Sequence, residues 1–140
     1  MILSCNYEEL SALRAGARTF LDDEEGEGGA VAAPPEVRAH VEGLVPQLRG
    51  DLSASTLHEV GVLLAAVSAI VEMLRIEMET MVVATHPADE GAVAAYFEFA
   101  HSFAVARRLE DMAQEMEAMI EVMTGAPSTP ESRRSFQFPD

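Results

Sequence analysis

The chain has 140 residues, enough for one domain with its own hydrophobic core. Hydrophobic residues make up 49% of it and aromatic residues only 6%, which favours a core of aliphatic side chains and methionine. The net charge of −15 argues against binding to nucleic acid or to anionic lipid, because both need a basic protein face, and it permits a basic protein partner.

The N-terminal end bears on the compartment of the protein. The single cysteine, Cys5, excludes a disulfide within the chain, and the first residues lack the basic and apolar regions of a signal peptide. The longest uncharged apolar run, residues 60–71, is shorter than the ~20 residues that a membrane span requires. We therefore expect a cytoplasmic protein that has no membrane segment.

Two short helices are expected in the first third of the chain. Asn6 and Glu9 have the spacing of a capping box, which predicts the start of the first helix. Residues 22–34 are acidic and rich in glycine, so they predict a loop. Pro35 suits the first position of the second helix, and Pro46 is expected to kink or end it.

A long antiparallel helical hairpin is the strongest prediction, with one helix over about 55–85 and the other over about 87–123. Ser53 or Ser55 is expected to cap the first of these helices. Its apolar residues recur at alternating steps of three and four, as in a coiled-coil seam, at Leu57, Val60, Leu64, Val67, Val71, Leu74, Met78 and Met81. The middle of this helix is apolar on every side, so we expect protein all around it.

The apolar positions of the second hairpin helix change face midway. The first half has its apolar face at Ala92, Tyr96, Phe99, Ala100 and Phe103. The second half has its apolar face nearly opposite, at Val105, Leu109, Met112, Met116, Met119 and Met123. The two halves are therefore expected to contact different neighbours. Because methionine adapts to varied partners, the four methionines are candidate partner-binding residues, and ordinary core packing is the alternative.

Two further segments are candidates for contacts with a partner. Arg107 and Arg108 interrupt the acidic surface of the second hairpin helix, and they are expected to pair with Glu110 and Asp111 or with another chain. Residues 126–140 are rich in proline and serine, and we expect them to form an extended tail after a single helical domain over 1–125. Phe136 and Phe138 alternate in this tail, a spacing that suits docking into a groove of a partner.

One set of residues suggests a metal site. Glu98 and His101 form a Glu-x-x-His pair, which on a helix directs a carboxylate and an imidazole toward one ion. Across an antiparallel hairpin, Glu77 faces position 98, so a homodimer would supply two such pairs and two more glutamates. This set resembles the half-ferritin proteins, which complete a di-iron site by dimerising, and the resemblance implies iron as cofactor. The alternative is an exposed glutamate beside an ordinary surface histidine.

The sequence predicts an all-α fold, similar to a four-helix bundle and completed by dimerisation or by a partner. We find no catalytic nucleophile with a nearby base and no phosphate-binding loop, so a non-enzymatic role is expected. The leading hypothesis is an interaction protein (accessory subunit, adaptor or chaperone) that acts through helix packing as a homodimer or with a protein partner. The alternatives are a ferritin-like iron protein and an acidic inhibitor that mimics nucleic acid.

Overall fold

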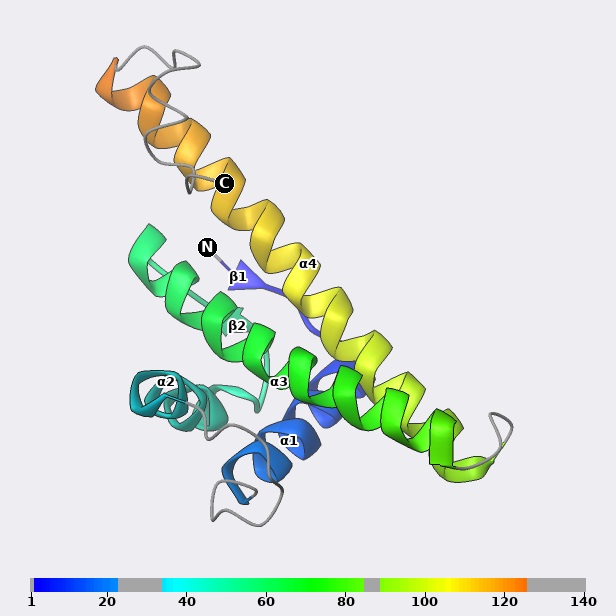
Figure 1. Ribbon diagram of the computed structural model, residues 1–140. Helices are drawn as coiled ribbons and strands as arrows, with labels where there is room; N and C mark the ends of the chain where they lie inside the picture. The colour runs from blue at the N-terminus through cyan, green and yellow to red at the C-terminus, as the bar shows by residue number, and fades with distance from the viewer. Residues whose placement is uncertain (1, 23–33, 85–88, 126–140) are drawn as a thin grey trace, which may run out of the picture.

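The computed structural model describes residues 2–22, 34–84 and 89–125 (Figure 1). Within these ranges the α-helices are α1 (Tyr7–Asp22), α2 (Pro35–Leu44), α3 (Leu57–Ala84) and α4 (Glu90–Thr124). The predicted all-α fold is confirmed, and α3 and α4 form the long hairpin. The shorter α1 packs against both long helices, and α2 packs against α3.

A small β-ribbon was not predicted. The strands β1 (Ile2–Leu3) and β2 (Leu52–Ser53) pair antiparallel, with Ile2 opposite Ser53 and Leu3 opposite Leu52. The ribbon holds the N-terminus against the segment that links α2 to α3, and both of its leucines are buried. Strands of two residues are too short to produce an alternating pattern, so no periodicity in the sequence indicates them.

The first two helices begin as their sequences predict. Asn6 Oδ1 accepts a hydrogen bond of 2.8 Å from the backbone N–H of Glu9, and Glu9 Oε1 accepts one of 3.0 Å from the N–H of Asn6. Pro35 is the first residue of α2, where a missing N–H costs nothing. Pro46 lies in the 3₁₀ turn η2 (Val45–Gln47), which follows the end of α2.

The predicted cap of α3 was wrong. Ser53 lies in β2, and the capping residue is Thr56, whose Oγ1 accepts a hydrogen bond of 3.1 Å from the N–H of Glu59. Glu59 Oε2 accepts in return from the N–H of Thr56 at 3.2 Å and also from the N–H of Ser55. A second capping box therefore places the helix start after both predicted serines.

Replacing Thr56 by alanine should lower the free energy of unfolding by about 1 kcal/mol, because the substitution leaves an N–H of the first turn without its acceptor. Urea denaturation of the two proteins measures the difference. Ser55→Ala is the matched control, since only the backbone of Ser55 contributes to this cap. An equal loss in both variants would contradict the assignment of Thr56 as the cap.

The start of α4 also differs from the prediction. The helix begins at Glu90, and Asp89 is its cap, with Oδ2 accepting a hydrogen bond of 3.1 Å from the N–H of Gly91. Pro87, the predicted first residue, lies outside the described residues. At the other end, Gly125 has a φ of 67° and its N–H donates to the carbonyl of Val122, so a left-handed glycine ends the helix close to the predicted position 123.

The core lies where α3 packs against α1, α2 and α4. The seam residues Val60, Val67, Val71 and Leu74 are buried there, and so are the off-seam residues Leu63, Ala66 and Ile70. The described residues do not enclose the helix, however, because Gly61, Ala65 and Ser68 are exposed. The expectation of protein on every side of α3 is therefore not met by the described part of the chain.

By length and composition, α3 is able to cross a membrane. Its most apolar stretch has a mean hydropathy of 1.8, and 39% of that stretch is buried inside the fold. The sequence-based exclusion of a membrane span counted only the uncharged run of residues 60–71, whereas a span tolerates one or two charged residues. Core helices of soluble proteins pass the same test, so this property of α3 assigns no location.

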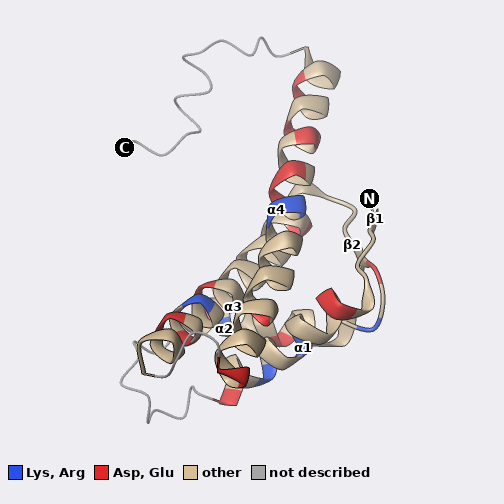
Figure 2. Ribbon diagram, turned by 90° about the vertical axis from the view of Figure 1, so that its right-hand side faces the viewer, with Lys and Arg blue, Asp and Glu red and all other residues tan. Residues whose placement is uncertain are grey.

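The two long helices differ in length. α4 has 35 residues and α3 has 28, a difference of about 10 Å along the axis. The helices also diverge with distance from the hairpin turn, and in both views the C-terminal end of α4 stands clear of the other described elements (Figures 1 and 2). Apolar residues on this end therefore have no cover within the described part of the chain.

Candidate functional site

The predicted metal ligands do not meet in one chain. Glu98 and His101 lie on α4 and face α1, where they line a surface hollow together with Tyr7 and Glu8. Glu77 is a half-buried residue of α3 and does not line this hollow. Over residues 2–22, 34–84 and 89–125, no group of three or more His, Cys, Asp or Glu side chains is placed to hold a metal ion. A set of ligands completed by a second chain stays a prediction.

The hollow between α1 and α4 has a volume of about 220 Å³. Its lining combines acidic, aromatic and small side chains, namely Tyr7, Glu8, Ser11, Ala12, Ala15, Phe97, Glu98 and His101. The rings of Phe97 and His101 stack at a centroid distance of 6.4 Å, and Tyr96 meets Phe97 edge-on at 5.7 Å. The hollow therefore offers carboxylates beside exposed aromatic faces.

The second half of α4 has an apolar stripe that continues past the bundle. Val105, Leu109 and Met112 are buried, and Met116 is half-buried against the same core. Farther along the same face, the exposed fraction rises to 58% at Met119 and 81% at Met123. Ala118 and Val122 join these last two methionines around a shallow apolar depression. The predicted partner-binding methionines thus divide into a core pair and an exposed pair.

The first half of α4 is largely uncovered on its predicted apolar face. Tyr96 and Phe103 are exposed, and Phe99 is half-buried, with its ring 5.7 Å from that of Phe103. Ala92 is the buried member of this face. The change of face along α4 therefore separates a side that packs on the core from a side that is mostly open to solvent.

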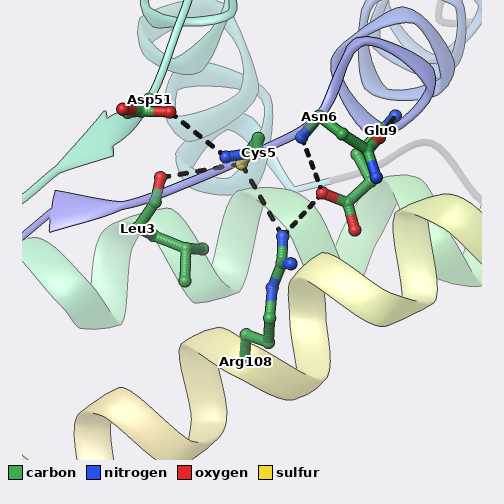
Figure 3. A network of polar contacts seen from close by, with 6 residues as sticks. All are labelled: Leu3, Cys5, Asn6, Glu9, Asp51 and Arg108. Atoms are coloured by element: carbon green, nitrogen blue, oxygen red, sulfur yellow. Dashed lines mark hydrogen bonds and ion pairs between the residues drawn. The ribbon is translucent and has the colours of Figure 1, made fainter.

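A polar junction fixes α4 to the N-terminal segment (Figure 3). Arg108 Nη2 donates to Glu9 Oε1 at 2.7 Å, and the same carboxylate oxygen caps α1 through Asn6. The same Nη2 lies 4.0 Å from the sulfur of Cys5, and the backbone N–H of Cys5 donates to Asp51 Oδ1. Sequence reasoning missed this junction, because it paired Arg108 with nearby acids of its own helix or with another chain.

The junction is structural in character. Glu9 is only 4% exposed, and its pairing with Arg108 satisfies a charge that burial would otherwise penalise. Burial raises the pKa of the Cys5 thiol above its ordinary value, and this effect outweighs the nearby Arg108 guanidinium, which lowers it. The cysteine is therefore a poor nucleophile at neutral pH.

The predicted tail contacts, Phe136 and Phe138, lie outside the described residues. Comparisons of the chain with protein-family models, with curated proteins and with solved structures find no match. The candidate surfaces are therefore the hollow between α1 and α4 and the exposed end of the α4 stripe.

Proposed function

We propose that this protein is a non-enzymatic interaction protein that acts through helix packing, with the C-terminal end of α4 as its main contact surface. The observation behind the proposal is the spacing of the stripe. Its residues follow one another at alternating steps of four and three, as in a coiled-coil seam, at Val105, Leu109, Met112, Met116, Met119 and Met123. The seam begins with residues buried in the core and continues to Met119 and Met123, which are exposed in the described part of the chain.

A second copy of the chain is the partner that we propose for this seam. Two α4 ends packed antiparallel would bury the same residues of both chains, which is the isologous contact of a twofold dimer. Met119 and Met123 would then lose the exposure that they have in the single chain. Glu115 and Glu117 are exposed on the same helix, so added salt should favour this contact by screening repulsion between the two acidic chains.

Met119→Glu is expected to weaken the dimer about 30-fold or more, because a carboxylate would replace an apolar side chain in the seam. Sedimentation equilibrium over a range of concentrations measures the dissociation constant. The hydrophobic core of one chain should be unaffected, since Met119 is more than half exposed there.

Val83→Glu is the matched control, because Val83 is an exposed apolar residue at the end of the other long helix. It should leave the dissociation constant unchanged. A wild-type protein that stays monomeric at every concentration, or equal weakening by the two substitutions, would contradict the proposal.

A further inference from the structure

The hollow between α1 and α4 contains acidic groups that have no partner among the described residues. Neither Glu8 nor Glu98 makes a hydrogen bond or an ion pair within the described residues, and both contribute to the lining. Glu9, the next residue along from Glu8, is by contrast buried and paired with Arg108. The carboxylates of Glu8 and Glu98 are therefore available to a ligand that does not belong to the described residues.

The lining of the hollow suits a guanidinium group. Carboxylates accept the N–H donors of arginine in paired, charge-assisted hydrogen bonds. The exposed rings of Tyr7 and Phe97 offer the aromatic faces on which a guanidinium or another ring stacks. A segment with arginine beside aromatic residues would complement the hollow in both respects.

The chain itself contains such a segment. Arg133 and Arg134 are followed within four residues by Phe136 and Phe138, and all of them lie outside the described residues. We propose that residues 133–138 of one protomer occupy the hollow between α1 and α4 of a second protomer. This inference rests on the proposed dimer, and it adds a second contact to the α4 seam.

The distance from the end of α4 to the hollow of its own chain is too long for easy contact by the tail, which favours the hollow of a second protomer. Along α4, the hollow lies about 36–42 Å from Gly125, at a rise of 1.5 Å for each residue from His101 or Phe97. The backbone of Arg134 can lie at most about 32 Å from Gly125, even in a fully extended chain. Reaching its own hollow would require complete extension of the chain and of the arginine side chain, which costs conformational entropy.

In an antiparallel dimer the tail reaches a hollow without this full extension. If the seams of two chains pair around Met119, Gly125 of one chain lies opposite position 113 of the other. The partner's hollow is then about 18–24 Å away along the helix, which the tail can span without full extension. The twofold axis would repeat the contact in both directions, and the high effective concentration in the dimer would fill both hollows even if each contact were weak.

A charge-swap experiment on the full-length chain tests the inference. One variant has Glu8→Lys with Glu98→Lys, and the other has Arg133→Glu with Arg134→Glu. Each variant alone should dimerise about 10-fold or more weakly than the wild type, because its hollow and its tail then have like charges. In the mixture, each hollow meets a tail of opposite charge, so the heterodimer should form within about 2-fold of the wild-type dissociation constant.

The control and the possible outcomes separate this inference from the proposed function. Glu110→Lys changes an exposed acid on α4 that does not line the hollow, and it should have no comparable effect. Dimers that resist all these charge changes but dissociate with Met119→Glu would overturn the tail contact and leave the seam in place. If each variant dimerises weakly and mixing the two variants does not restore dimerisation, the exchange of tails between chains would be overturned. A monomeric wild type would overturn both proposals.

Discussion

Arg108→Ala is expected to lower the free energy of unfolding by about 2 kcal/mol, because it leaves the carboxylate of Glu9 buried without its cationic partner. The figure is below that for a fully buried pair, since the side chain of Arg108 is 40% exposed and water partly screens it. Urea denaturation followed by circular dichroism measures the loss.

Arg107→Ala provides the matched control for this substitution. Arg107 is the neighbouring residue on the same helix, but it is exposed, and its removal should change stability by less than about 0.5 kcal/mol. Adding Glu9→Gln to Arg108→Ala should recover part of the loss, because a neutral amide is cheaper to bury than an unpaired carboxylate. Equal effects of the two arginine substitutions would show that the pairing with Glu9 contributes nothing.

Gly16→Val is expected to destabilise the fold by about 3 kcal/mol, because α1 crosses α3 too closely for a side chain at this position. A β-carbon on Gly16 would lie 2.5 Å from Cγ2 of Ile70 and 3.2 Å from Cδ1 of Leu74. Both of these neighbours are buried in the core, so neither has free space to move into. Thermal and urea unfolding both report the change.

Gly61→Val is the control for this prediction. Gly61 is also a helical glycine, but a β-carbon there would meet no atom within 4 Å. Since valine has a better helix propensity than glycine, Gly61→Val should be neutral or slightly stabilising. If both valine substitutions had the same effect, the close crossing of α1 and α3 would not be the reason for glycine at position 16.

The parts of the fold that were predicted depend on residues close together in the sequence. The capping box of Asn6 and Glu9 spans three positions, and the hairpin helices follow from apolar residues at regular steps. The pairing of Glu9 with Arg108 joins residues 99 positions apart, so no local pattern could reveal it. The cap of α3 was missed for a different reason, because Ser53, Ser55 and Thr56 all precede the helix and only Thr56 has a glutamate, Glu59, three positions later.

The candidate site was predicted in part. Glu98 and His101 were selected from their spacing, and they do lie side by side on one surface. Their neighbours are Tyr7 and Glu8 of α1 instead of Glu77 of α3, because α1 lies against this part of α4. The position of α1 depends in turn on its close approach to α3 at Gly16, which a single sequence does not reveal.

In the proposed dimer, the free end of α4 would link the helix content of the protein to its concentration. An isolated helix of a few turns is only marginally stable in water, since most helical stability comes from packing of an apolar face. The last turns of α4, around Met119 and Met123, have no such packing in the single chain. The proposed dimerisation would therefore stabilise the helical form of this segment, and dilution would favour fraying of its last turns.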